Sequence, residues 1–411
     1  MSERMFFEDG WSAGQVARAL DEAKCDDVDW RRGRAPMYVF NAGQALYDVT
    51  RDAFMAFFTE NALGTRAFPS LVRLERDVIA MANEILRGPA EPAGAFTSGG
   101  TESIFLAIKT ARDWSRAHGR ARDTLVVPDT AHPAFNKAAH YMDLRVVRVP
   151  VRTDLRADVD GMAAAIDDRT LLVTGSAPCF PFGVIDPIGD LAALATARGV
   201  WMHVDACVGG FLAPFVRRVG YPVPPFDLSV PGVDSISADL HKLGFAAKPA
   251  STVLYRSREL LDYQGFRFDA WPRGTYDVPG FTGTRPGGAV AAAWATLRYL
   301  GARGYMDIAR RIMALRSRLS AGITAIEGLH ILSDPELNII AYGSDHLDMR
   351  ALADGLTDRG WLVGRNARPP AIHFMLVPLH EVMVDDYLRD LAVAAEEVRA
   401  GRAARRVAAT Y

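Results

Sequence analysis

Apolar residues follow two different periods along the chain, and the change between them separates regions of different structure. Residues 53–58 form an apolar run typical of a helix, and the apolar positions between Leu71 and Leu86 keep helical spacing. From Ala95 onward, short strand-like runs alternate with helical segments. The expected strands cover residues 124–127, 145–149, 170–174, 200–204, 233–237 and 252–255. The expected helices between the first of these strands cover residues 102–118, 134–141, 158–166 and 187–198.

Strand–helix alternation predicts an α/β fold, because crossover helices cover both faces of a mostly parallel sheet. Near Gly301 the pattern changes. It then indicates a helix at 305–326, a strand at 338–342, a helix at 349–359, a strand at 371–377 and a C-terminal helix. We therefore expect an N-terminal arm with helices at 1–60, a large domain at 61–300 and a small α+β domain at 301–411.

Composition and charge narrow the classes of function. The chain of 411 residues is 49% hydrophobic and 23% charged, as in ordinary globular proteins. Its 47 basic and 49 acidic side chains nearly cancel, so nothing indicates a nucleic-acid partner. Three cysteines without a Cys-x-x-Cys pair indicate neither a disulfide framework nor a zinc site, and they favour a cytoplasmic location. The charged first ten residues and the lack of an apolar run of about 20 residues predict no signal peptide and no membrane anchor.

A glycine-rich turn opens the first helix of the alternating region. Ser98, Gly99, Gly100 and Thr101 follow an apolar run and precede the helix at 102–118. Glycines let the backbone approach an anion, the first N–H groups of a helix point toward it, and a threonine hydroxyl adds a donor. The turn therefore suits a phosphate group, although by itself it also fits an ordinary helix cap.

An aspartate and a lysine follow two later strands. Asp205 ends one strand, where a buried carboxylate either caps the strand or meets a cation such as a protonated pyridine nitrogen. Lys242 comes 37 residues later, beside His241, directly after a strand where lysines are rare. We expect desolvation to lower the pKa of Lys242, which suits imine chemistry. Although a His-Lys pair alone is usually exposed, the ordered set of three features favours pyridoxal 5′-phosphate (PLP) held as a Schiff base on Lys242.

Seven segments in this order resemble the sphingosine-1-phosphate lyase family, which belongs to the PLP-dependent group II decarboxylases. They are residues 98–104 (SGGTESI), 132–139 (HPAFNKAA), 181–187 (PFGVIDP), 203–212 (HVDACVGGFL), 233–239 (VDSISAD), 241–242 (HK) and 283–288 (GTRPGG). The similarity runs from about Tyr38 to beyond Pro370. It implies the type I fold of PLP-dependent transferases, which is aspartate aminotransferase-like, and a homodimer with shared active sites at the subunit interface. The chain resembles the soluble bacterial members.

The resemblance also implies a role for each residue that matches a family motif. Lys242 would carry the cofactor, Asp205 would pair with its pyridine nitrogen, and His132 would stack on its ring. Tyr38 of the N-terminal arm would face the substrate, and Lys248 matches the second lysine of the family pattern His-Lys-x-Gly-x-x-x-Lys. These five are the expected catalytic residues. The expected ligands of the cofactor phosphate are Gly100, Thr101 and His241 from one subunit, and Gly283 and Thr284 from the other.

The chain departs from the family on the substrate side. Gly64 stands where the family has a histidine after Asn-x-Leu. Leu243 and Phe245 replace two tyrosines of the family, and Pro249 replaces a glycine. Cofactor residues are thus retained while residues near the substrate change, which leaves the substrate open.

Three functions fit these residues. The first is a PLP-dependent lyase that splits a 3-hydroxy amine, phosphorylated or not, into an aldehyde and an amine by retro-aldol cleavage. A substrate phosphate needs cations, for which Lys248 is the first choice and Arg285 the second. The second is a decarboxylase of amino acids on the same scaffold. The third, a non-catalytic PLP-binding protein, is disfavoured because Lys242, Asp205 and His132 are all present. The expected ligand is a small amine or amino acid.

Overall fold

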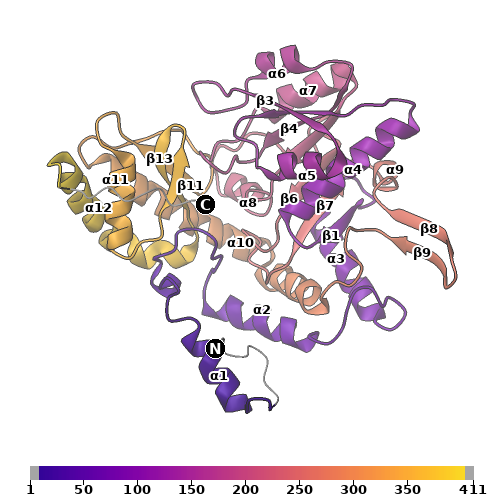
Figure 1. Cartoon of the computed structure of the whole chain (residues 1–411), viewed down its shortest axis with the longest axis horizontal. Coiled ribbons are helices and arrows are strands. Elements are labelled where there is room, and N and C mark those ends of the chain that lie inside the picture. Colours follow the sequence, from indigo (N-terminus) through magenta and orange to yellow (C-terminus); the bar gives the residue numbers. More distant parts are fainter. Residues whose placement is uncertain (1–8, 403–411) are drawn as a thin grey trace, which may run out of the picture.

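The computed structural model describes residues 9–402. A seven-stranded sheet forms the centre of its larger part, in the order β1-β7-β6-β5-β4-β2-β3 (Figure 1). Five neighbouring strands, from β6 to β3, are parallel, whereas β7 is antiparallel to β1 and β6. The strands are β1 (Gly94–Thr97), β2 (Thr124–Pro128), β3 (Arg145–Val149), β4 (Thr170–Ser176), β5 (Trp201–Asp205), β6 (Ser235–Ala238) and β7 (Ser251–Tyr255). The six strands expected from the sequence and the mostly parallel sheet are therefore confirmed.

Helices cover both faces of this sheet because its strands are apolar on both sides. In β2, Leu125 and Val127 pack into one hydrophobic cluster and Val126 packs into another on the opposite face. The first cluster includes side chains of α4 (Gly100–Ala117), α5 (Ala134–Met142) and α9 (Arg258–Leu261). The second cluster includes side chains of α3 (Pro69–Ile85), α6 (Val159–Ala165), α7 (Ile188–Arg198) and α8 (Ala213–Arg218).

A smaller antiparallel sheet, in the order β10-β11-β13-β12, has a hydrophobic cluster of its own. Its strands are β10 (His330–Ile331), β11 (Ile339–Gly343), β12 (Gly364–Ala367) and β13 (Pro370–Met375). It packs with α11 (Met349–Asp358), η2 (Pro378–Met383) and α12 (Val384–Arg399). This is the small α+β unit that the sequence pattern predicts, although β10 and β12 were not expected.

One long helix, α10 (Gly287–Thr324), joins the two parts (Figure 1). It begins 18 residues before the helix expected at 305–326, because two helical segments run together across a kink at Gly301. Gly301 has φ 51° and ψ −174°, a conformation that favours glycine. The kink coincides with the predicted boundary at residue 300, and the division into three domains stays a prediction.

The N-terminal segment and a hairpin complete the described structure. The N-terminal segment contains α1 (Ala13–Glu22), η1 (Trp30–Arg32), α2 (Gln44–Ala56) and an extended stretch. This stretch runs between the part with the seven-stranded sheet and the part with the four-stranded sheet. The hairpin of β8 (Phe266–Trp271) and β9 (Gly274–Val278) projects from the body on the right of Figure 1. Every residue of β8 is exposed, so this strand lacks the buried face from which strands are predicted.

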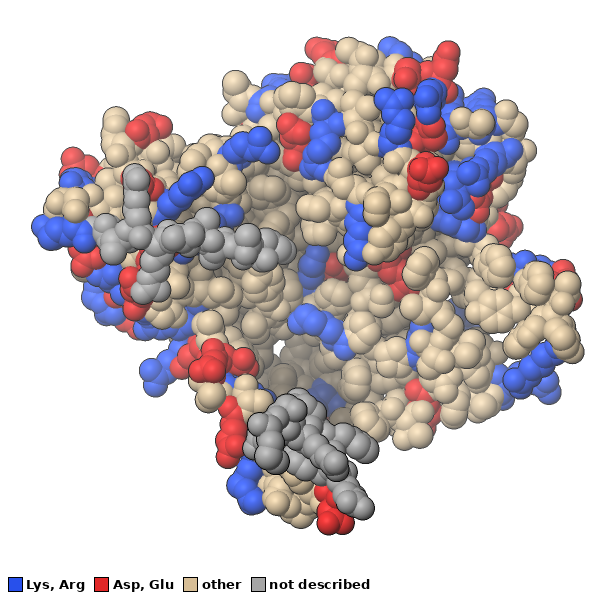
Figure 2. Space-filling view, in the orientation of Figure 1, with Lys and Arg blue, Asp and Glu red and all other residues tan. Residues whose placement is uncertain are grey.

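Over residues 9–402, no helix combines the length and apolarity that crossing a membrane requires. Basic and acidic side chains are interspersed over the face shown in Figure 2.

Candidate active site

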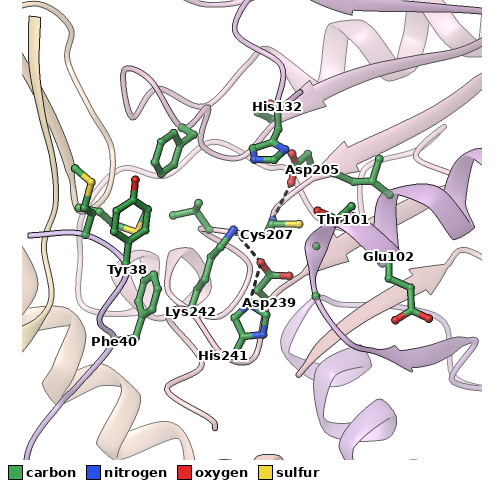
Figure 3. A pocket seen from close by; sticks show the side chains of 18 of the residues that line it. Tyr38, Phe40, Thr101, Glu102, His132, Asp205, Cys207, Asp239, His241 and Lys242 are labelled. Atoms are coloured by element: carbon green, nitrogen blue, oxygen red, sulfur yellow. Dashed lines mark hydrogen bonds and ion pairs between the residues drawn. The ribbon is translucent and has the colours of Figure 1, made fainter. Parts of the chain in front are cut away.

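The sheet topology brings several polar side chains to one edge. Ser176 ends β4, Asp205 ends β5, and Asp239 follows β6. Because parallel strands end at the same edge of a sheet, these residues come together there, the usual place for a ligand in an α/β fold. They line a cavity of about 440 Å³, whose other polar residues include His132, His241 and Lys242 (Figure 3).

Lys242 is held in this cavity by Asp239. Its Nζ lies 2.8 Å from Oδ2 of Asp239, and its side chain is 24% exposed (Figure 3). Burial lowers the pKa of Lys242, but the negative charge of Asp239 outweighs burial, so the pKa is raised. The expectation of a lowered pKa is therefore wrong for the chain alone, because it considered desolvation without the neighbouring carboxylate.

Asp239 is itself surrounded by donors. Its Oδ1 accepts a hydrogen bond of 2.5 Å from the Ser251 hydroxyl, and its Oδ2 lies 3.8 Å from Nε2 of His241. Burial raises the pKa of Asp239, but the positive charge of Lys242 outweighs it and the pKa is lowered. The buried carboxylate thus keeps its negative charge and fixes the lysine in place.

His241 and His132 are both neutral donors on their Nε2 side. The Ala250 N–H donates to Nδ1 of His241, and the Ala134 N–H donates to Nδ1 of His132, at 3.0 and 3.1 Å. An Nδ1 that accepts a hydrogen bond leaves the proton on Nε2. Burial, as the largest effect, lowers the pKa of both rings and favours this uncharged form.

Asp205 lies near His132 at the upper side of the cavity in Figure 3. Its side chain is largely buried and accepts a hydrogen bond of 3.1 Å from the Cys207 N–H. A buried carboxylate with one backbone donor has further acceptor positions. It can therefore accept a hydrogen bond from a protonated ring nitrogen bound in the cavity.

The glycine-rich turn lies where α4 begins, and its Thr101 is on the side of the cavity away from Tyr38 (Figure 3). The N-cap of α4, Gly99, supplies no side-chain hydrogen bond to the helix. A Cβ atom at Gly100 would lie 2.5 Å from Sγ of Cys207 and 3.0 Å from a carboxylate oxygen of Asp239. Glycine at this position therefore lets the turn pack closely against Cys207 and Asp239. Gly99, Gly100 and Thr101 line the cavity, where the first N–H groups of α4 can meet an anion.

Tyr38 and Lys248 occupy the side formed by the N-terminal segment. Tyr38 lines the cavity, is 52% exposed and has φ 66°, whereas Lys248 does not line it. Nζ of Lys248 donates to the Tyr38 carbonyl at 3.4 Å and lies 5.7 Å from the centre of the Phe40 ring. Burial lowers the pKa of Lys248. Because Phe40 lines this cavity and the adjoining one to which Lys248 belongs, the ammonium lies at their common wall.

Besides Lys248, other residues considered in the sequence analysis lie outside the cavity of this chain. Gly283 and Thr284 are in the loop between β9 and α10 and do not line it. Arg285 forms an ion pair of 2.7 Å with Glu75, and its role as a further cation for the substrate stays a prediction. Gly64 lies beside Phe68, whose ring would be 3.3 Å from a Cβ atom there.

Asp239 and Glu102 line the cavity, although the sequence analysis assigned no role to them. Asp239 stands three residues before Lys242, a spacing that in a turn brings a carboxylate near an ammonium group. Glu102 lines the cavity, accepts a hydrogen bond of 2.7 Å from the Ser98 N–H, and accepts another of 3.2 Å from the Phe281 N–H. Glu102 thereby joins the glycine-rich turn to the loop that contains Gly283.

Comparison with known proteins agrees with this geometry. The model of the pyridoxal-dependent decarboxylase conserved domain matches residues 36–344. Sphingosine-1-phosphate lyase of Arabidopsis thaliana is 40% identical over 94% of this chain and 72% of its own length. The solved structure of sphingosine-1-phosphate lyase from Burkholderia pseudomallei has a TM-score of 0.92 and 35% identity, and covers 97% of this chain and 94% of that one. A "probable L-tyrosine/L-aspartate decarboxylase" of Methanothermobacter thermautotrophicus is 33% identical over 84% of this chain and 93% of its own.

The chain belongs to the pyridoxal-dependent decarboxylase family, and its cofactor is PLP. Within that family it is a sphingosine-1-phosphate lyase-like member, and it is a PLP-dependent lyase homologous to sphingosine-1-phosphate lyase. The cavity suits PLP in each chemical respect. It offers an amine for the aldehyde, a buried carboxylate for the ring nitrogen, and a helix start without a Cβ atom for the phosphate.

Proposed function

We propose that this enzyme cleaves a carbon–carbon bond in a 3-hydroxy amine by a retro-aldol reaction, which releases an aldehyde and a smaller amine. The main support is the 2.8 Å contact of Lys242 with buried Asp239, in the same cavity as His132 and Asp205. The 35–40% identity to sphingosine-1-phosphate lyases over most of the chain supports this reaction over others of the family.

The proposal gives each residue of the cavity a task. Lys242 would hold the cofactor covalently, and Asp205 would keep a proton on its ring nitrogen. Gly100, Thr101 and His241 would bind its phosphate, and His132 would lie against its ring. When bound, PLP supplies an electron sink for the bond that breaks next to the amine.

Proton transfers would be carried out by groups that line the cavity. Cleavage of a 3-hydroxy amine requires a base for the hydroxyl proton and an acid for the carbon that remains. The candidates are His132, whose neutral ring carries its proton on Nε2, Tyr38 at the mouth and Lys242, which Asp239 holds in place. Lys248 would attract an anionic group on the substrate from the wall between the two cavities.

The loop at Gly283 and Thr284 would serve the partner subunit. Neither residue lines the cavity of its own chain, and the loop is joined to α4 through Glu102. In a homodimer with shared sites, the two residues would complete the phosphate site of the other subunit.

Decarboxylation of an amino acid is the second candidate function. The relative from Methanothermobacter thermautotrophicus, at 33% identity, supports it, and so does Gly64, which replaces a histidine of the lyase family. Incubation of the PLP-loaded enzyme with 3-hydroxy amines, their phosphate esters and amino acids separates the two. The proposal requires aldehyde in equal amount to the substrate consumed, and no carbon dioxide. Carbon dioxide from an amino acid, without aldehyde from any hydroxy amine, would establish the decarboxylase.

A further inference from the structure

A second cavity, outside the candidate active site, lies where α3, α8 and α10 meet. Its volume is about 590 Å³, within the range of small-molecule sites and above that of the candidate active site. The kink at Gly301 forms part of its wall. None of the roles proposed for PLP or for the substrate involves this cavity.

The floor of the cavity is apolar, and its side chains are closely packed. Phe215, Leu297 and Tyr305 are 4%, 4% and 2% exposed, and Met81 and Ile85 of α3 lie beside them. The rings of Phe215 and Tyr305 stack with centroids 4.8 Å apart and an angle of 12°. Such a floor favours a hydrocarbon chain, because each buried methylene group contributes about 0.8 kcal/mol.

The rim of the cavity carries an excess of positive charge. Four arginines line it, against the two acidic residues Glu84 and Asp227; the arginines are Arg87, Arg217, Arg218 and Arg298. Arg298 lies 3.9 Å from Asp77, outside the cavity, and Asp227 is completely buried. Four arginines thus face three carboxylates, so one positive charge remains in excess. Oδ2 of Asp227 lies 2.9 Å from Arg87 and 3.7 Å from Arg217, while its Oδ1 accepts a hydrogen bond from Ser229.

The two arginines that share Asp227 oppose each other. Burial lowers the pKa of Arg217, and the charge of Arg87 lowers it further. A second anion at the rim would relieve this repulsion, since guanidinium groups bind carboxylates and phosphates with charge-assisted hydrogen bonds.

We propose that this cavity is a binding site for a single-chain amphiphile with an anionic head group. Its hydrocarbon chain lies on Phe215, Leu297 and Tyr305, and its carboxylate or phosphate meets the arginines of the rim. Arg218, at the end of α8, is exposed, as are Arg87 and Arg298, so a head group reaches the rim from solvent.

The position of the cavity connects it to the lysine turn. The Tyr305 hydroxyl donates a hydrogen bond of 2.8 Å to the carbonyl of Gly244, two residues beyond Lys242. A chain lying on Tyr305 therefore contacts a residue that supports the loop of Lys242.

Calorimetric titration of the PLP-loaded full-length enzyme with decanoate and with decyl phosphate tests the site. Below the micelle concentration, at least one of the two should bind once per chain, and the pair shows whether the head group is a carboxylate or a phosphate. Arg218→Glu should weaken that binding tenfold or more, because a reversed charge at the rim loses about 1.4 kcal/mol or more. Arg303→Glu is the matched control, since it changes the same charge on α10 outside the cavity, and it should alter the affinity less than twofold.

Further titrations measure separately how the head group and the hydrocarbon chain of the proposed ligand contribute to binding. Decanol lacks the charge and inorganic phosphate lacks the chain, so each should bind at least tenfold more weakly than the charged amphiphile. Ala302→Trp, at an exposed position of the wall, should fill the cavity and remove binding while the fold is retained. The proposal is wrong if neither amphiphile binds, if Arg218→Glu and Ala302→Trp bind as the unchanged enzyme does, or if decanol or phosphate binds equally well.

Discussion

The ammonium group of Lys242 lies 2.8 Å from the carboxylate of Asp239, and this buried contact sets the charge of the lysine. The contact raises the pKa of Lys242, although burial alone lowers it. In the chain without cofactor, the lysine is therefore protonated at neutral pH. A carboxylate that holds the lysine also slows its attack on an aldehyde, because only the neutral amine is a nucleophile.

Asp239→Asn should separate the two effects of this carboxylate, which holds Lys242 in place and slows its attack on an aldehyde. Loss of the negative charge lowers the pKa of Lys242, so more neutral amine exists at pH 7 and PLP should attach to the apoenzyme faster. Turnover should nevertheless fall by roughly ten- to a hundredfold, because a charged hydrogen bond worth about 1.5–3 kcal/mol no longer positions the lysine. Stopped-flow absorbance records attachment of PLP, and steady-state rates record turnover. Slower attachment across the pH range would contradict the role given to Asp239.

Lys248→Ala should separate substrate binding from cofactor binding. The ammonium group of Lys248 lies at the wall of the cavity and contacts the N-terminal segment, so the visible spectrum of bound PLP should remain nearly unchanged. Turnover of an anionic substrate should fall by roughly ten- to a thousandfold, the range for a charged hydrogen bond that acts partly in the transition state. Asp205→Ala is the contrasting variant, and it should weaken PLP binding and abolish every reaction. Full activity of Lys248→Ala would leave the lysine as an ordinary loop residue.

If the active sites of a homodimer are shared between subunits, two inactive variants should restore activity when they form a mixed dimer. Sedimentation of the enzyme should give about twice 44.9 kDa. Lys242→Ala lacks the lysine, and Gly283→Trp blocks the loop that would reach the partner's phosphate site. A heterodimer of the two should regain one complete site, and hence about half the activity of the unchanged dimer. A fully active monomer, or the absence of any recovery in mixed dimers, would argue against shared sites.

Acid should destabilise the fold through buried histidines such as His380. Burial lowers the pKa of His380 to about 4, and the Val377 N–H donates to its Nδ1, where a proton would have to bind. Because the ordinary pKa is 6.5, the unfolded chain binds the proton first as the pH falls. Stability should therefore decrease from pH 6.5 to 4 by about 1.4 kcal/mol per pH unit for this residue. The free energy of unfolding of His380→Phe, measured with urea at several pH values, should decrease less steeply between pH 6.5 and 4 than that of the unchanged enzyme. This holds whatever the stability of the variant at pH 8.

The sequence pattern was sufficient for features that each depend on a short segment. The six strands, the glycine-rich turn and the residues Asp205 and Lys242 follow from apolar runs and from what ends them. The hairpin of β8 and β9 was not predicted, because all of β8 and most of β9 are exposed, so no buried face marks the strands. The raised pKa of Lys242 and the ion pair of Arg285 with Glu75 depend on neighbours that only the folded chain supplies.

The most direct test is to reduce the PLP-loaded enzyme with borohydride and to identify the labelled peptide by mass spectrometry. Borohydride converts the imine between PLP and its lysine into a stable bond, so the label marks the residue that holds the cofactor. We predict a single modified lysine, Lys242, and no covalent label in Lys242→Ala. Label on Lys248 or on any other lysine would contradict the assignment of this cavity as the active site.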